Sequence, residues 1–405
     1  MTLPTATARA EGQVPLSFLL FLALMTSVVA LTIDAVLPAL DRISADLAFE
    51  HENDRQAIVL NVLLGMGFSQ LIFGPMADAI GRKRTALAGW AIYLAGTVIA
   101  VGGGTAEWML AGRFLQGLGA GGPRVVANTM ARDLYEGNAL ARVVSLVMTV
   151  FMLVPILAPL IGQGIEAVLG WQAIFALYIA LALISGGWYL LGVPETLDPA
   201  KRRPFRLRPL YAAFAEVLRT RQTICCALSA ALVFGPFVVY LATAQQVLEE
   251  LYALGPLFPL VFSSVAVAFG AATFLNARLV MRHGMYRCAV AGFALLIAVS
   301  GLVCALIWLG VSGPVPPLWI YLGAIGLIFV AVAILVANLT ALALNPMGHM
   351  AGTAAAVINS VAALGSALIG REIAALYDGT LTPMLLGFLV LGCAGFALFW
   401  LGMRR

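Results

Sequence analysis

The sequence predicts an all-α polytopic membrane protein, with twelve transmembrane helices in two pseudo-symmetric six-helix bundles. The composition, the length of the apolar runs and a weak internal repeat support this prediction. Of the 405 residues, 62% are hydrophobic and 10% are charged, and the mean hydropathy is +1.00. A soluble domain is about a quarter charged, so these few polar residues could not cover a water-exposed surface.

The apolar runs give the number of spans, because a helix needs about 20 apolar residues to cross a bilayer. The first half supplies six runs of this kind, and the second half supplies six more. The expected spans are 15–40, 56–77, 85–103, 106–132, 141–165, 171–192, 223–248, 254–281, 286–310, 317–343, 352–375 and 381–402.

The distribution of Lys and Arg predicts the orientation, since these residues concentrate on the cytoplasmic side of a membrane. With the N-terminus inside, eighteen of the 23 basic residues lie on the inner side. Only Arg42, Arg55 and Arg371 then lie on the outer side. We therefore expect both termini to be cytoplasmic.

The chain is expected to divide into an N-terminal bundle (1–192), a basic cytoplasmic linker (193–222) and a C-terminal bundle (223–405). The linker contains seven basic residues and is interrupted by four prolines, and we expect it to contact anionic lipid. A repeat supports duplication of the bundles: Gly81 with Arg84 recurs as Gly284 with Arg287, 203 residues later. Repeated bundles with a site between them are typical of secondary transporters.

The stretch from Gly74 to Thr85 is expected to be a short cytoplasmic turn between two spans. Gly81 suits a turn, because glycine adopts positive φ angles without strain. The positive-inside rule alone accounts for the basic trio Arg82–Arg84. It does not account for Asp78, whose carboxylate needs a cation or a helix N-terminus, such as the one near Gly352.

Three ionisable residues, Asp34, Arg113 and Arg124, lie well within predicted spans, where a charge is costly unless it is paired or hydrated. Asp34 and Arg113 are each expected roughly 10 Å below the outer surface, so they can be partners. Arg124 lies eleven residues after Arg113 and on the same helix face, which indicates a hydrated cavity. It has either a structural role or a binding role, with anionic lipid, Asp133 or a substrate carboxylate as possible partners.

Asp34 is the candidate proton carrier. Burial raises the pKa of a carboxyl group and a nearby arginine lowers it, so a change in the distance to the arginine would let protonation follow conformation. The alternative is a permanent ion pair with Arg113 that only fixes packing. In the second half, uncharged polar and aromatic side chains at membrane depth are candidates for contacting a substrate. The full set of candidate substrate-binding residues is Asp34, Arg113, Arg124, Asn128, Tyr240, Gln245 and Asn338.

The turn matches the pattern G-x-x-x-D-x-x-G-R-K at Gly74, Asp78, Gly81, Arg82 and Lys83, and so resembles the signature of the major facilitator superfamily. The resemblance implies the major facilitator fold. It also implies that the acid of this motif helps to latch the two bundles together on the cytoplasmic side.

Further stretches are similar to the Bcr/CflA group, the bicyclomycin-resistance type of drug:proton antiporter. They are TIDAVLPAL (32–40), AGRFLQGLGAG (111–121), ARDLY (131–135), PILAPLIG (155–162), PETL (194–197) and HMAGTAAA (349–356). The resemblance implies that Asp34 and Arg113 take part in proton coupling. The span-five motif departs from the family pattern, with Ala158-Pro159 in place of Gly-Pro, although its prolines remain. The expected gate residues are Gly74, Asp78, Gly81, Arg82, Lys83, Pro155 and Pro159.

These observations predict proton-coupled efflux of small drugs or related molecules across the bacterial inner membrane. The alternative is a dedicated exporter of an anionic or zwitterionic metabolite such as a siderophore, amino acid or nucleoside, and a third class is a non-transporting sensor or scaffold. The expected partners are a small-molecule substrate, protons and membrane lipids. No nucleic acid, no metal and no cofactor beyond the proton is expected, and the protein is expected to function as a monomer. The sequence contains no candidate residues for an enzyme.

Overall fold

The structure, a computed structural model, describes residues 14–198, 200, 202, 207–311, 313 and 315–404. Several of the basic residues used to predict the orientation lie outside the described residues, namely Arg9, Lys201, Arg203, Arg206 and Arg405. The secondary structure of the described part is helical throughout, without a β-strand. This confirms the predicted all-α class.

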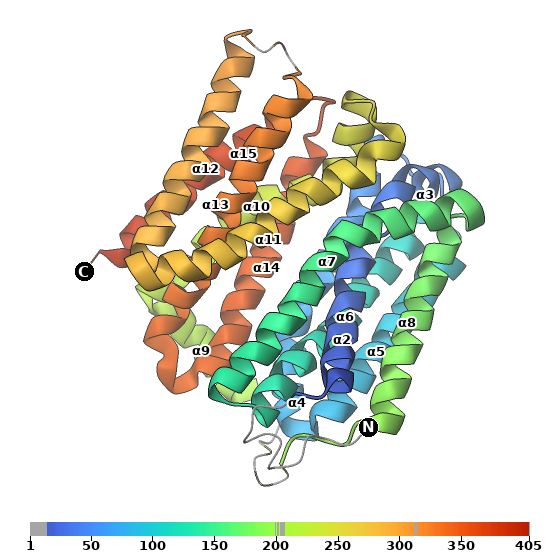
Figure 1. The fold of residues 1–405 in the computed structure, drawn as a ribbon, viewed down its shortest axis with the longest axis vertical. Helices are drawn as coiled ribbons and strands as arrows, with labels where there is room; N and C mark the ends of the chain where they lie inside the picture. The colour runs from blue at the N-terminus through green and yellow to red at the C-terminus, as the bar shows by residue number, and fades with distance from the viewer. Residues whose placement is uncertain are drawn as a thin grey trace. The chain divides into compact units, whose positions relative to one another are not determined.

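The chain divides into two compact units. Unit 1 comprises the described residues up to Phe49 together with Asn61–Leu207, and unit 2 comprises Glu50–Leu60 together with Arg208–Arg405. The helices up to residue 192 are α2 (Leu16–Asp34), η1 (Leu37–Ala39), α3 (Leu40–Asp46), η2 (Glu52–Gln56), α4 (Ala57–Ile80), α5 (Arg82–Gly102), α6 (Ala106–Leu134), α7 (Gly137–Leu169) and α8 (Trp171–Gly192). Figure 1 shows α2 beside α6 and α7, which it contacts.

The later helices follow a similar plan of long spans joined by short connections. They are α9 (Leu207–Arg219), α10 (Arg221–Gln245), the π-helix η4 (Gln246–Leu251), η5 (Gly255–Leu257), α11 (Phe258–His283), α12 (Met285–Trp308), α13 (Leu318–Leu344), η6 (Asn345–Met350), α14 (Ala351–Ala375) and α15 (Thr382–Met403). Helix α10 packs against α13, α14 and α15 (Figure 1). Helix α9 lies within the stretch for which the sequence predicts a linker.

Each of the twelve predicted spans corresponds to a long helix. Among the described residues, eleven segments are long and apolar enough to cross a membrane. The twelfth helix, α6, is 29 residues long but is not one of the eleven. The charged residues that α6 carries, among them Arg113, Arg124 and Arg132, lower its hydropathy.

The first predicted span, 15–40, falls in the membrane-spanning segment Leu16–Asp46, but this segment is not one continuous α-helix. Helix α2 ends at Asp34, and a 3-10 turn with Pro38 precedes the short helix α3. Proline lacks an N–H and disfavours the α conformation in the residue before it, so the α-helix breaks here. Asp34 is therefore the last residue of α2, whereas the sequence places it six residues before the end of a continuous span.

Small residues allow close packing of α6. A Cβ atom added at Gly112 or Gly119 would overlap the backbone of α5, and one added at Gly117 would overlap the Val62 carbonyl of α4. Small residues let helix backbones approach each other closely in membranes. The glycines therefore place Arg113, which lies among them, deep inside unit 1.

The internal repeat is visible in the backbone. Gly81 precedes α5 with φ 102° and ψ 161°, and Gly284 precedes α12 with φ 80° and ψ 157°. Both positive φ angles are accessible to glycine at low cost. The two sequence copies thus form turns of the same kind between consecutive helices.

Candidate functional site

The turn between α4 and α5 consists of one residue, Gly81, and is tighter than the sequence suggests. Asp78 still belongs to the last turn of α4, and Arg82 is the first residue of α5. A Cβ atom at Gly81 would overlap the carboxylate of Glu195, in addition to the strain of its positive φ. The positive φ therefore favours glycine here, and a larger residue would also have to displace the Glu195 carboxylate.

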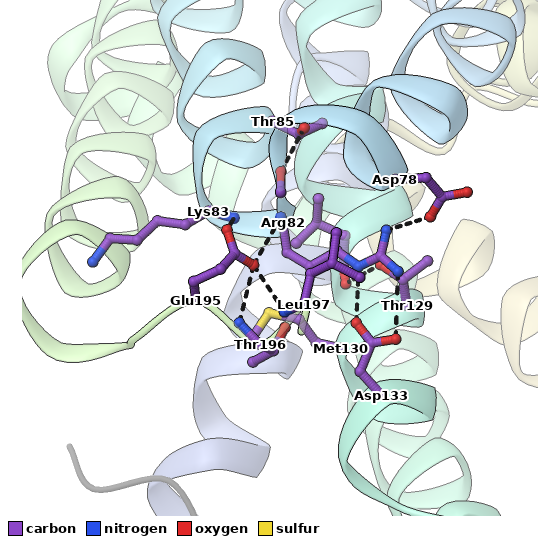
Figure 2. Close-up of polar contacts among 12 residues, drawn as sticks. Asp78, Arg82, Lys83, Thr85, Thr129, Met130, Asp133, Glu195, Thr196 and Leu197 are labelled. Carbon is purple, nitrogen blue, oxygen red and sulfur yellow. Dashed lines mark hydrogen bonds and ion pairs between the residues drawn. The ribbon is translucent and has the colours of Figure 1, made fainter. Parts of the chain in front are cut away.

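Glu195 caps the N-terminus of α5 from a distant part of the chain. Its carboxylate accepts hydrogen bonds from the backbone N–H groups of Arg82 at 2.9 Å and Lys83 at 3.2 Å (Figure 2). The first N–H groups of a helix have no intrahelical partner, and the helix dipole favours an anion there. The same carboxylate accepts the N–H groups of Thr196 and Leu197, each at 3.0 Å, which holds the chain after α8 in place.

Arg82 lies between two carboxylates, as Figure 2 shows. Its Nη1 is 2.6 Å from Asp78 Oδ1, and its Nε is 2.8 Å from Asp133 Oδ2. The residue is only 5% exposed, and its backbone N–H is the one that Glu195 caps. The expectation that the positive-inside rule alone explains Arg82 is therefore wrong, because a buried guanidinium needs these partners.

Lys83 also has a defined structural role. Its Nζ donates to the carbonyl oxygens of Leu190 at 2.8 Å and Val193 at 2.9 Å. These carbonyls lie at the C-terminal end of α8, where the helix dipole favours a cation. Only Arg84 of the basic trio is simply exposed.

Asp34 is buried at the C-terminal end of α2, with 5% of its surface exposed. Among the described residues, none forms a hydrogen bond or an ion pair with its carboxylate. The pairing with Arg113 that the sequence allows is thus not formed in this conformation.

Arg113 is fully buried and binds the backbone two residues before Asp34. Its Nη2 donates to the carbonyl oxygen of Thr32 at 2.9 Å, and its Nη1 donates to Gln116 Oε1 at 2.6 Å. The last carbonyls of a helix lack intrahelical partners and carry the negative end of its dipole. The break after Asp34 therefore creates a binding position for the guanidinium.

Neighbouring side chains hold Arg113 and the end of α2 in place. Gln116 Nε2 donates to Thr97 Oγ1 at 2.8 Å, so α5 orients the amide that Arg113 binds. The hydroxyl groups of Thr32 and Tyr93 are 2.6 Å apart. The guanidinium also lies 5.7 Å from the centroid of the Phe175 ring, a cation–π distance.

Helix α7 contacts α2 next to Asp34. A Cβ atom at Gly162 would overlap the carbonyl oxygen of Ala35, the residue that follows Asp34. Pro155 and Pro159 lie inside the same helix, about two turns and one turn before Gly162. The proline-containing stretch of α7 thus lies directly against the helix break that carries Asp34.

Arg124 and Asn128 lie one turn apart on α6 but away from Arg113. Arg124 is partly exposed and Asn128 is exposed. Asp133, one partner that the sequence allows for Arg124, is instead bound to Arg82. Among the described residues, none pairs with the Arg124 guanidinium.

The three candidates in unit 2 lie in separate sets of contacts. Tyr240 packs against Phe329 with ring centroids 4.7 Å apart. Gln245 donates to Glu249 at 3.1 Å, and Asn338 donates to Asn276 Oδ1 at 2.8 Å. Each of the three side chains therefore has contacts within unit 2.

A polar cluster in unit 2 was not anticipated from the sequence. Arg55, which is 7% exposed, forms an ion pair with Glu250, and Gln56 donates to Gln246 at 2.7 Å. Asn53 donates to the carbonyl oxygen of Tyr377 at 2.8 Å. Burial raises the pKa of the Tyr377 phenol to about 12; Glu250 adds to this rise and Arg55 opposes it. The contacts attach Glu50–Leu60 to helices far along the chain, and sequence spacing gives no sign of them.

Comparisons with known proteins agree with this architecture. The family model of the Major Facilitator Superfamily matches residues 21–370. The chain is 29% identical to the bicyclomycin resistance protein homolog of Haemophilus influenzae over 91% of each chain. It is 26% identical to multidrug resistance protein D of Escherichia coli over 89% of each chain. The crystal structure of the human organic anion transporter MFSD10 has a similar fold, with a TM-score of 0.66, 19% identity, and coverage of 95% of this chain and 98% of that one.

Proposed function

Since the chain belongs to the Major Facilitator Superfamily, it is a multi-pass membrane transporter of small molecules and not an enzyme, and we propose that it exports drugs or related compounds in exchange for protons. It acts in the bacterial inner membrane as a monomer of the Bcr/CflA type, with both termini in the cytoplasm. The names of its bacterial relatives, which are resistance proteins, support an efflux function.

One observation above all supports proton coupling: a carboxylate, that of Asp34, is buried at a break in a membrane helix. A charge at membrane depth is costly unless it has a function or a partner. Among the described residues the Asp34 carboxylate has no such partner, while the nearest expected cation, Arg113, binds a backbone carbonyl two residues away.

This geometry suggests how proton binding and conformation are coupled. Arg113 has two competing acceptors, the Thr32 carbonyl and the Asp34 carboxylate. When Asp34 is ionised, its charge attracts the guanidinium; when Asp34 is protonated, the neutral carbonyl of Thr32 is the better partner. Exchange of Arg113 between the two changes the contacts at the end of α2, next to the proline-containing stretch of α7.

The proton gradient supplies sufficient free energy for uphill export. One charge crossing the membrane contributes about 2.3 kcal/mol per 100 mV. Each pH unit adds about 1.4 kcal/mol. The entry of a proton down this gradient therefore releases enough free energy to drive cargo out against its own concentration gradient.

Arg82 and the carboxylates around it, those of Asp78, Asp133 and Glu195, form the cytoplasmic gate in this proposal. The other gate residues are Gly74, Gly81, Lys83, Pro155 and Pro159. The half-exposed Asp78 carboxylate is the mobile part, since its side chain is 50% exposed whereas that of Asp133 is 22% exposed. Asp133 and Glu195 hold the turn together when Asp78 changes partner.

The decisive experiment is uphill export from vesicles with the Asp34→Asn variant. The variant should fold but no longer couple export to a proton gradient, because the amide cannot exchange a proton. Asp198→Asn, at an exposed aspartate after α8, is the control and should export normally. Unaltered proton-driven export by Asp34→Asn would disprove the assignment.

A dedicated exporter of an anionic or zwitterionic metabolite is the second candidate, and Arg124 favours it. Arg124 lies on α6, which is expected to cross the membrane, and among the described residues none pairs with its guanidinium. A cargo carboxylate would supply the missing charge, through Arg124 and Asn128. Binding measurements with Arg124→Ala separate the two candidates: a loss confined to carboxylate cargo supports the second.

A further inference from the structure

Helix α9 exposes three large apolar side chains along one side. Tyr211 is 74% exposed, Phe214 40% and Leu218 49%. At 100° per residue these three positions fall within about 60° of one another around the helix. Tyr211, Phe214 and Leu218 thus form one apolar surface, the α9 face.

The opposite part of α9 is packed on the protein or hydrogen bonded. Ala213 and Val217 are fully buried. Glu216 Oε1 lies 2.9 Å from Nε2 of His349 in η6. The buried and the exposed apolar side chains thus lie on different sides of α9.

The position of α9 along the chain places it at a membrane surface. It ends at Arg219, and the membrane span Arg221–Leu251 begins two residues later. Thr223 of that span donates to the carbonyl oxygen of Ala343 at 3.0 Å, near the end of a second span, Leu318–Met350. Two membrane helices therefore fix the depth of the α9–α10 junction.

From these observations we infer that α9 lies in the interface of the membrane, with the α9 face inserted below the headgroups of an anionic leaflet. Tyr is suited to the headgroup level, and Phe and Leu to the acyl boundary beneath it. Arg219 and Arg221 lie at the same junction and supply positive charge for lipid phosphates. The inference goes beyond the transport function, because it depends on neither the cargo nor the coupling ion.

Charge and apolar character together identify the lipid surface as the occupant. If the α9 face were in contact with bulk water, three large apolar side chains at helical spacing would be unfavourable there. A helix that lies in the membrane interface needs such side chains to insert between the lipids. A second copy of this chain or a soluble partner would also cover the face, so the experiment distinguishes these occupants from lipid.

The test uses the full chain with its five cysteines replaced and one cysteine introduced at position 214 or 212. Ala212 is exposed and lies about 100° from Tyr211, outside the α9 face, so it is the matched control. Each variant carries a polarity-sensitive fluorophore in phosphatidylcholine vesicles, with or without phosphatidylglycerol. Lipids brominated at shallow acyl carbons serve as quenchers.

We expect at least about twofold stronger quenching of the label at 214 than of the label at 212, and a larger difference with phosphatidylglycerol. Equal quenching at the two positions would overturn the inference. Cross-linking between copies through a cysteine at 214 would overturn it in favour of a second copy of the chain.

The unaltered chain provides a second measurement that needs no substitution. Amide hydrogen exchange of Leu207–Arg219 in nanodiscs should slow at least about threefold when phosphatidylglycerol is added, because lipid contact stabilises the helix. Exchange that is the same in both lipids would contradict anchoring by an anionic leaflet.

Discussion

Arg113 donates a 2.9 Å hydrogen bond to the carbonyl oxygen of Thr32, at the C-terminal end of the helix that carries Asp34. The guanidinium occupies the position that the helix break at Pro38 creates. It therefore links α6 to α2 through the backbone, and it does so without neutralising the buried carboxylate.

Replacing Arg113 with Lys should reduce proton-driven export by at least about tenfold while the protein still folds. Lysine keeps the charge but cannot bond the Thr32 carbonyl and Gln116 simultaneously in the planar geometry of Arg. The measurement is export against a pH gradient in vesicles, with the melting temperature in detergent as the control for folding. Full activity of Arg113→Lys would show that only the charge matters.

Replacing Gly162 with Ala should destabilise the contact between α7 and α2 by about 1–3 kcal/mol, since the added methyl group overlaps the Ala35 carbonyl. The apparent melting temperature in detergent is the readout. Gly164→Ala is the matched control, because a Cβ atom there meets nothing within 4 Å. Equal melting temperatures for the two variants would contradict the close approach.

The two carboxylates around Arg82 should differ in their effect on stability. Asp78→Asn should cost less than about 1 kcal/mol, since the pair is half exposed to solvent. Asp133→Asn should cost about 2 kcal/mol, because it removes the more buried charged acceptor of a guanidinium that is 5% exposed. Thermal unfolding of both variants gives the comparison, and a larger loss for Asp78→Asn would reverse this assignment.

Glu195→Gln should weaken the start of α5 by about 1 kcal/mol, which is typical of the loss of a charged cap. Amide exchange of the first residues of α5 should then become faster. The first residues of α12 provide an internal control, because Gly284 occupies a similar turn. Faster exchange at both sites would indicate a general loss of stability and not the loss of a cap.

Replacing Arg55 with Gln should loosen Glu50–Leu60 from the rest of unit 2. A hydrogen bond to a charged group is worth about 1.5–3 kcal/mol, and Glu250 would lose its partner. Amide exchange of residues 50–60 should accelerate while that of α5 stays constant. Unchanged exchange in both segments would show that the ion pair contributes little to holding this segment.

Composition and the spacing of the apolar runs predicted the membrane class and the twelve long helices, because the need for about 20 apolar residues per span is a local property. The turn at Gly81 was also predictable, since a positive φ favours glycine wherever it occurs. Asp34, Arg113 and Arg124 stood out for the same reason: a charge within an apolar run is visible in the sequence itself.

The partners of these charges were decided by the tertiary structure. Arg82 meets Asp133 51 residues away, and Glu195 caps the turn from 113 residues away. No spacing rule reaches across such distances, because these contacts depend on which helices pack together and at what depth. The break after Asp34 likewise gave Arg113 a backbone carbonyl to bind, which a continuous helix would not have offered.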